Sequence, residues 1–316
     1  MITIYTTDSH AVVESQSLCK NCWINAYSIN RGDLNRLEHT FGIEEALLTD
    51  IMDIDEQARI EKIDNGKEVY TALIVRLPIC EEGLEVPFFT VPLGIILFPD
   101  KIITICQHSS DTINDIIKNR VKGFCLENQN TFVLNLLGRA AFTFLKSLKE
   151  LNKRTNAIKE ELRRSIKNNE LIQLLSIQKS LVYFTTSIKT NELLLEKLQK
   201  SPLIRFKEEE WELLEDVVIE NRQAIEMANI YSSILTGTMD AFASVISNNL
   251  NIVMKQLTTV SIVLMIPTLL YSFFGMNVKF PFDETNRFIM LGICIMSIVA
   301  SICGAIILTR PPKQNH

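Results

Sequence analysis

Two stretches near the C-terminal end of the chain contain no charged residue. They are residues 256–278 and residues 288–309. About 20 apolar residues in a helix span the hydrocarbon core of a bilayer, so each stretch is long enough to cross a membrane. The nine residues between them are too few for a domain. We expect a membrane hairpin, because the alternative, two buried helices of a soluble core, rarely contains charge-free runs of this length.

The residues around the two stretches predict an orientation. The N-terminus lacks the basic and long apolar segments of a signal peptide, so we expect the large N-terminal part to stay in the cytoplasm. Two spans return the tail, residues 310–316, to that side, where Arg310 and Lys313 fit the positive-inside rule. The loop of residues 279–287 would be extracytoplasmic. These features predict a multi-pass protein of the cell membrane, surrounded by lipid, with both termini cytoplasmic.

The composition argues against other classes of protein. The chain has 32 basic and 37 acidic residues, which does not fit a basic nucleic-acid binder, so no nucleic-acid partner is expected. Seven cysteines in 316 residues are too few for a disulfide scaffold, and the pair Cys19 and Cys22 lacks the second pair of a zinc site. The sequence has no nucleophile paired with a base and no phosphate-binding glycine loop. We therefore expect neither an enzyme nor an organic cofactor.

Residues 1–125 have the pattern of a cytoplasmic α/β domain. Its strands are predicted by runs of branched apolar residues bounded by Gly, Pro or Asp. These runs are residues 69–77, 93–98 and 102–107. Helices are predicted on either side of Gly42, at residues 33–41 and 44–52.

Residues 126–202 predict a hairpin of long cytoplasmic helices. Between residues 130 and 200 there is no proline, and Gly138 is the only glycine. Leu and Ile recur there at helical spacing. Ser201 and Pro202 end the segment.

A stalk helix is predicted over residues 203–278, continuing into the first span. Residues 203–266 contain no proline and one glycine, and such a helix is about 95 Å long. Eight acids and one base lie between residues 208 and 226, whereas Asp240 is the only charge from 227 to 254. A helix nearly free of charge on every side must be covered by other helices, and one chain offers too few. Copies of the chain are the natural cover, which predicts a symmetric homo-oligomer closed around the helix axis.

One face of this helix, the polar stripe, is polar or soft where the rest is bulky. Its members recur at spacings of three and four: Asn251, Met254, Thr258, Ser261, Met265, Thr268 and Ser272. Asn248 and Leu257 lie on the same side. Such groups can line a wet pore if they face a ring axis, or they can form a seam of small residues between packed helices. The uncharged segment before the stripe favours the pore.

The first stretch ends in Gly275-Met276-Asn277. At the outer end of the first of two C-terminal spans, this motif resembles the signature of the CorA magnesium transporter family. The segments before it that also resemble the family are Ser247-Asn248-Asn249-Leu250-Asn251 and Val253-Met254-Lys255, with Leu257 and Thr258. Cys22-Trp23-Ile24 and Ile74-Val75-Arg76-Leu77-Pro78 resemble strands of the family's cytoplasmic domain. The resemblance covers nearly the whole chain.

This resemblance implies a funnel-shaped homopentamer that transports Mg²⁺, with Co²⁺ or Ni²⁺ as further ions. The stalk helices would line the pore, and the second span, residues 288–309, would form an outer ring. The implied pore-facing residues are Asn251, Met254, Leu257, Met265, Thr268 and Asn277. Many family members continue with Met-Pro-Glu-Leu after the motif, where this chain has Val278-Lys279-Phe280-Pro281-Phe282-Asp283-Glu284. The choice of ion stays open, since related families move zinc, cobalt or nickel.

The residue types at the motif suit a hydrated cation. Mg²⁺ dehydrates reluctantly, so a ring of Asn277 amides could accept hydrogen bonds from its water shell. Gly275 lets backbones approach closely at the mouth, and Met276 would anchor the turn by packing. Rings of Met254 and Leu257 would form an apolar constriction that shuts by losing its water. A divalent ion that crosses about 100 mV gains about 4.6 kcal/mol, which can drive entry without a nucleotide.

Asp216 lies where the family places a regulatory magnesium site between subunits. Carboxylates of neighbouring copies repel each other until a cation bridges them, so cytosolic Mg²⁺ would hold the ring closed. The alternative for these acids is a solvated face. Glu81, Glu82 and Glu85 are candidate partners. A different function, a membrane-anchored sensor or scaffold, would need neither Asn277 nor the polar stripe.

Overall fold

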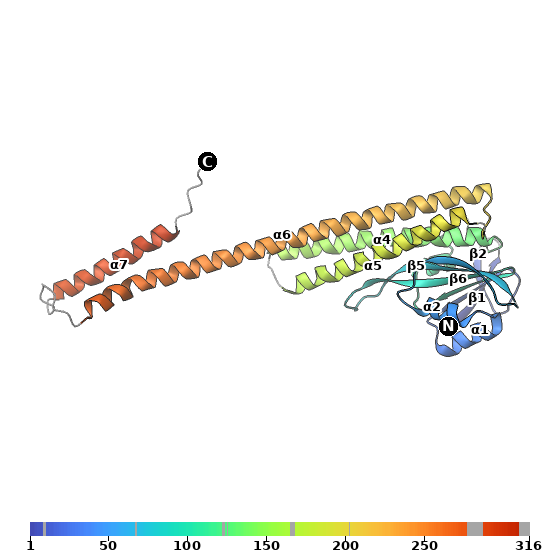
Figure 1. Cartoon of the computed structure of the whole chain (residues 1–316), viewed down its shortest axis with the longest axis horizontal. Coiled ribbons are helices and arrows are strands. Elements are labelled where there is room, and N and C mark those ends of the chain that lie inside the picture. Colours follow the sequence, from blue (N-terminus) through green and yellow to red (C-terminus); the bar gives the residue numbers. More distant parts are fainter. Residues whose placement is uncertain are drawn as a thin grey trace. The chain divides into compact units, whose positions relative to one another are not determined.

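The computed structural model describes residues 1–8, 11–66, 68–121, 124, 126–164, 168–201, 203–276 and 287–309. The chain forms two compact units, Met1–Met239 and Asp240–His316. The first unit contains a β-sheet, helices α1 to α5 and the beginning of α6. The second contains the rest of α6 and α7 (Figure 1).

A seven-stranded sheet forms the centre of the first unit (Figure 1). Its strands are β1 (Ile2–Asp8), β2 (Ala11–Ser15), β3 (Cys22–Tyr27), β4 (Arg59–Asp64), β5 (Val69–Cys80), β6 (Phe88–Phe98) and β7 (Lys101–Cys106). Their order across the sheet is β2-β1-β3-β7-β6-β5-β4. β3 pairs with β7 in parallel, and the other neighbours are antiparallel.

The central strands are buried on both faces, which explains their unbroken apolar sequences. Alternate residues enter two separate cores. Leu73 of β5 packs in the core that contains Phe132 of α4 and Leu194 of α5. Its neighbour Ile74 packs in the core that contains Leu37 and Ile51 of the first two helices. The sheet therefore lies between two layers of helices, and the predicted α/β class is confirmed.

The three predicted strands are present, but two are longer than the sequence indicated. β5 continues through Pro78, and β6 begins before Pro92. In the antiparallel ladder of these strands, Pro78 pairs with Thr90 and Pro92 pairs with Arg76. Arg76 directs its backbone N–H and C=O to the side chain of Asn191, each over 2.9 Å. The Arg76–Pro92 pair therefore needs no hydrogen bond between the strands, so the missing N–H of Pro92 costs nothing there.

Helices α1 (Arg31–Phe41) and α2 (Glu45–Met52) cover one face of the sheet. Asn30 and Asp33 form a capping box at the start of α1. Gly42 ends α1 with a φ of 65°, a left-handed conformation that glycine adopts without strain. Helix α2 packs closely on β6 at Gly94. A Cβ at this position would lie 2.2 Å from Cδ1 of Ile51, so only glycine allows this approach.

Helices α3 (Asp111–Ile117), α4 (Gln129–Arg164) and α5 (Asn168–Lys200) cover the other face. The predicted pair of long helices between residues 130 and 200 is therefore present. Asn191 of α5 extends the hydrogen bonding of β5 beyond the end of β4, since it bonds the backbone of Arg76. The Arg76 guanidinium is itself buried and donates to the carbonyls of Ile54 and Glu56.

Helix α6 runs from Glu208 to Phe274 without a break. Its first turn is fixed by Glu210, whose carboxylate accepts hydrogen bonds from the Asn128 and Asn130 side chains. At 67 residues it is about 100 Å long. It passes through Pro267, and helices in membranes tolerate proline because neighbouring groups satisfy the freed carbonyl.

The second unit consists of the end of α6 and α7 (Arg287–Thr309). The two helices pack through small residues of α7: a Cβ at Gly304 would lie 2.8 Å from Cδ1 of Ile266. The other small residues at least partly buried on α7 are Ser297, Ala300, Ser301 and Ala305. Small residues let membrane helices approach closely.

Candidate functional site

The polar stripe of α6 is exposed along its whole length within the chain. Met254 is 54% exposed and Met265 is 67% exposed, and Leu257 beside them is 61% exposed. Asn251, Thr258, Ser261 and Thr268 are exposed as well. Nothing in the described part of the chain covers this face.

Helix α7 packs on the other side of α6. The α6 residues that are partly buried in the second unit are Thr259, Val263, Ile266, Pro267, Leu270 and Phe274. With 3.6 residues per turn, their mean direction lies roughly 160° from that of the polar stripe. The stripe is therefore the face of α6 most distant from α7.

Three of the four hydroxyl groups of the stripe bond in the same way. Those of Thr258, Ser261 and Thr268 donate to the carbonyl four residues earlier, over 2.8, 2.9 and 3.0 Å. A hydroxyl that has donated its hydrogen still carries two acceptor lone pairs. At these three positions the stripe consequently presents hydrogen-bond acceptors to whatever lies in front of it.

The end of α6 leads into the Gly-Met-Asn motif. The N–H of Gly275 donates to the carbonyl of Tyr271 over 2.9 Å, and that of Met276 to Phe273 over 3.4 Å. A Cβ at position 275 would lie 3.1 Å from the Tyr271 carbonyl oxygen, so glycine suits this close approach. Met276 is exposed. Asn277, the predicted selectivity residue, and the loop from Val278 to Glu284 lie outside the described residues.

From residue 243 on, the nearly uncharged segment of α6 has little cover in this chain. Every residue from 243 to 258 is exposed. The large apolar side chains among them are Val245, Ile246, Leu250, Ile252, Val253, Met254 and Leu257. Apolar side chains exposed on all sides of a helix mark a surface that contacts other molecules.

Asp216 lies on the exposed side of α6 beside Glu220 and Arg139, at a cavity of about 290 Å³. Burial, and then the charge of Asp216, raise the pKa of Glu220 above its ordinary value. Arg139 also bonds Asp115 with its Nε, over 3.0 Å. Burial alone would raise the pKa of Asp115. Hydrogen bonds from Arg139 and Arg120 instead hold this pKa below its ordinary value.

The three candidate partners of Asp216 do not line this cavity. Glu82 pairs with Arg154, and Glu85 pairs with Lys179 over 3.1 Å. Among the described residues, no group of three or more His, Cys, Asp or Glu side chains lies close enough to hold a metal ion. Within one chain Asp216 therefore has the neighbouring acid Glu220 but not a complete ligand set.

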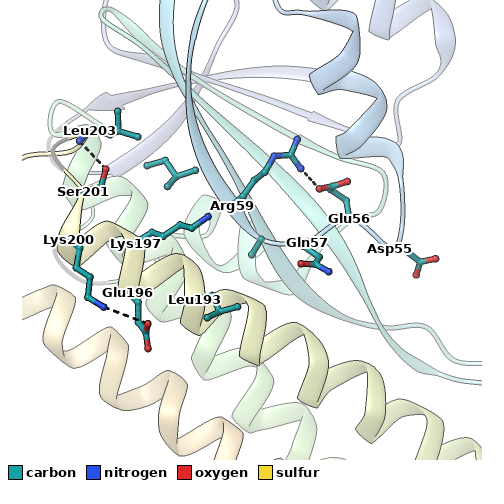
Figure 2. Close-up of a pocket in the computed structure, with 12 residues that line it drawn as sticks. Asp55, Glu56, Gln57, Arg59, Leu193, Glu196, Lys197, Lys200, Ser201 and Leu203 are labelled. Atoms are coloured by element: carbon teal, nitrogen blue, oxygen red, sulfur yellow. Dashed lines mark hydrogen bonds and ion pairs between the residues drawn. The ribbon is translucent and has the colours of Figure 1, made fainter.

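A larger cavity, of about 1020 Å³, lies between the segment that leads into β4 and the end of α5 (Figure 2). Two of its three basic side chains are paired with acids. Arg59 pairs with Asp50, Glu56 and Glu61, and Lys200 lies 3.9 Å from Glu196. We assign no chemistry to this cavity.

One contact that the sequence did not indicate joins α6 to α7. The Tyr271 hydroxyl donates to Sγ of Cys294 over 3.6 Å. In the sequence, Cys294 looks like a small packing residue. Tyr271 likewise stands in an apolar run, where nothing distinguishes it from a side chain that faces lipid.

Comparisons with known proteins agree with this architecture. The model of the CorA-like Mg²⁺ transporter protein family matches residues 20–310. The chain is 25% identical over 285 residues to the cobalt/magnesium transport protein CorA of Methanocaldococcus jannaschii, covering 89% of this chain and 87% of that one. It is 21% identical over 280 residues to the protein of the same name from Thermotoga maritima, covering 87% and 78%.

The fold is shared with a solved structure as well. The complete structure of the CorA magnesium transporter from Methanocaldococcus jannaschii matches with a TM-score of 0.80 at 21% identity, over 97% of this chain and 96% of that one. Among the described residues, two helices are long and apolar enough to cross a membrane: α6 and residues Leu291–Leu308 within α7. The α/β domain, the long helix and the C-terminal apolar helix thus occur together in both proteins.

Proposed function

Because the chain belongs to the CorA-like Mg²⁺ transporter family, we propose that it carries Mg²⁺ across the cell membrane through a pore formed by five copies of itself. The family is one of transporters rather than enzymes. The observation that carries the proposal is the exposed polar stripe of α6, on the side away from α7. In a ring of chains with α6 inside and α7 outside, this stripe faces the axis.

The need for several copies follows from the exposed segment of α6. Residues 243–258 have apolar side chains on all sides and no cover in one chain. Packing the α6 helices of neighbouring copies around an axis buries this surface, and a closed ring leaves no unpaired interface. The arrangement is a funnel-shaped homopentamer, with lipid around the α7 helices.

The acceptors of the stripe suit an ion that keeps its water. The waters around Mg²⁺ point their hydrogens outward, and stripping them is costly. The hydroxyl oxygens of Thr258, Ser261 and Thr268 offer lone pairs to those hydrogens, since their own hydrogens are bonded within the helix. At the mouth, the Asn277 side chains of five copies would accept in the same way, with Gly275 and Met276 forming the turn.

Two further elements would control the flow. Rings of Met254 and Leu257 form an apolar constriction, which closes when it loses its water. Asp216 binds regulatory Mg²⁺ between neighbouring copies, and its second ligands come from the next chain, because the described residues of one chain hold no group of three metal-binding side chains. Cytosolic Mg²⁺ then holds the ring closed, while the membrane potential drives entry when it opens. Both termini lie in the cytoplasm.

The test is ion uptake by the full chain in proteoliposomes under an inside-negative potential, with its native mass measured in the same preparation. We expect a pentamer that takes up Mg²⁺, with Co²⁺, Ni²⁺ and Zn²⁺ compared side by side to establish the preference. A monomer, or a pentamer that passes none of these ions, contradicts the pore and favours a membrane-anchored scaffold. If Zn²⁺ is taken up faster than Mg²⁺, the proposed pore stands and Zn²⁺ replaces Mg²⁺ as the proposed ion.

A further inference from the structure

The two helices of the second unit are joined by a polar cluster as well as by apolar packing. The Tyr271 hydroxyl of α6 donates to Sγ of Cys294 over 3.6 Å. Ser297, which is only 1% exposed, lies beside the same phenol group. Polar side chains within spans are costly to leave unpaired, so such a cluster fixes how two helices face each other.

The backbone of Tyr271 holds the motif that follows it. Its carbonyl accepts the N–H of Gly275 over 2.9 Å. A Cβ at position 275 would lie 3.1 Å from that oxygen, so glycine suits this close approach. The residue whose side chain is tied to α7 therefore also positions the first residue of Gly275-Met276-Asn277.

Tyr271 also lies at the boundary between the two faces of α6. Leu270 before it is partly buried on the α7 side, and Ser272 after it belongs to the exposed polar stripe. Rotation of α6 about its axis would turn the stripe and at the same time pull the Tyr271 hydroxyl away from Cys294 and Ser297. The contact of Ile266 with Gly304 lies more than a turn earlier, whereas Tyr271 lies one turn before Gly275.

We infer that Tyr271 is a positioning residue for ion discrimination, which it exerts by fixing the rotation of the last turn of α6 against α7. This inference rests on the proposed transport function. Tyr271 does not touch the ion. A firmly held ring of motifs fits the octahedral shell of Mg²⁺ and rejects the larger, less regular shell of Ca²⁺. A ring whose last turns can rotate accepts both more equally.

The experiment compares Mg²⁺ and Ca²⁺ uptake by proteoliposomes that contain Tyr271→Phe, which keeps the ring and removes the hydroxyl. We expect assembly as in the native protein and a Ca²⁺/Mg²⁺ uptake ratio raised about threefold, the factor that corresponds to one interhelical hydrogen bond in a membrane. Ser297→Ala should raise the ratio in the same direction. The double variant should be no worse than the stronger single one, because both changes break one cluster.

Two control variants separate this role from simple packing. Cys294→Ser keeps a hydrogen-bond acceptor and should keep the native ratio. Tyr183→Phe removes a phenol hydroxyl from the first unit, where Tyr183 is 46% exposed, and should also change nothing. The inference would be overturned if Tyr271→Phe and Ser297→Ala kept the native Ca²⁺/Mg²⁺ uptake ratio, or if their effects on that ratio simply added in the double variant. Mg²⁺ uptake by the native protein would still uphold the proposed function in that case. Absence of uptake by the native protein would instead overturn the proposed function.

Discussion

The two units of the chain differ in how completely they bury their own side chains. In the first unit, residues such as Trp23, Leu73 and Phe132 are fully buried, and the sheet has helices on both faces. In the second unit α6 meets α7 along one face and leaves its polar stripe and most of its apolar surface exposed. One chain thus completes a fold in its first unit, whereas by our proposal a functional site on the second requires copies of the chain and lipid.

The comparison predicts that changes at the end of α6 affect transport and leave the fold intact. The largest effect is expected for Asn277→Ala. Symmetry removes five amide groups at once, and at about 0.5–1.5 kcal/mol for each hydrogen bond the rate of Mg²⁺ uptake falls well over tenfold. Native mass in detergent should not change, because the residue follows the helix.

Two further variants sharpen that result. Asn277→Asp keeps the shape but adds up to five charges, so it should bind ions more tightly and release them more slowly. Cys303→Ala, at an exposed position of α7, should transport at the native rate. Native uptake by Asn277→Ala would show that the motif is not the selectivity element, and the scaffold function would then be favoured.

The opposite behaviour is expected in the first unit, at Gly94. An alanine there would place Cβ 2.2 Å from Cδ1 of Ile51, and overpacking of this kind costs about 1–3 kcal/mol of folding free energy. The thermal unfolding midpoint, followed by the fluorescence of buried Trp23, should fall, and Ile51→Val in the same chain should restore part of it. Uptake per folded oligomer should stay native; a loss of uptake without a loss of stability would erase the distinction between the units.

Asp216 tests whether the first unit also holds a site between copies. If Mg²⁺ bridges neighbouring chains there, Asp216→Ala should weaken the protection of the cytoplasmic part from protease by Mg²⁺. The Mg²⁺ concentration needed for protection should rise about fivefold or more, a common size for coupling between sites. Glu209→Ala removes another exposed acid of α6, about two turns earlier, and should leave the protection curve in place. Identical curves for both variants would assign Asp216 to a solvated acidic face.

The smallest effect is expected for a single hydroxyl of the stripe. Thr258→Val keeps the shape of the side chain and removes an acceptor, and neighbouring levels of the stripe share the ion's water shell. Mg²⁺ uptake should fall about two- to threefold, the value of a weak hydrogen bond of about 0.5 kcal/mol. Thr259 is a matched control, since its hydroxyl bonds the Lys255 carbonyl over 2.8 Å but it lies on the α7 side. Equal losses in Thr258→Val and Thr259→Val would mean that the stripe does not face the ion.

The long helices and the central strands could be predicted from the sequence because their signals are local. Absence of Gly and Pro indicates α4 and α5, and continuous apolar runs indicate β5 and β7. The full extent of β6 could not be predicted from the sequence. A proline at position 92 is acceptable in the strand because the opposite residue, Arg76, directs its backbone to Asn191, which is 115 positions away in the chain. The strands β1, β2 and β4 were not predicted, since they carry many polar residues.

The candidate site divides in the same way. The spacing from Asn251 to Ser272 is a property of one helix, so the stripe could be recognised without a structure. The contact of Tyr271 with Cys294 joins residues on two helices, and nothing local distinguishes these side chains from lipid-facing ones. The second ligands of Asp216 belong to another chain by our proposal, so neither the sequence nor one subunit can identify them.

The inward bonding of the stripe hydroxyls has a consequence for anions. Chloride needs hydrogen-bond donors, and the hydroxyl hydrogens of Thr258, Ser261 and Thr268 are already engaged with backbone carbonyls. At these three positions a conduit lined by this face would offer an anion no hydroxyl hydrogen, and it would disfavour negative ions there without a formal charge on its wall. Refusal of this kind does not depend on a Debye length of about 8 Å at physiological ionic strength, as repulsion from a carboxylate ring would. The discrimination between cation and anion should therefore persist in concentrated salt.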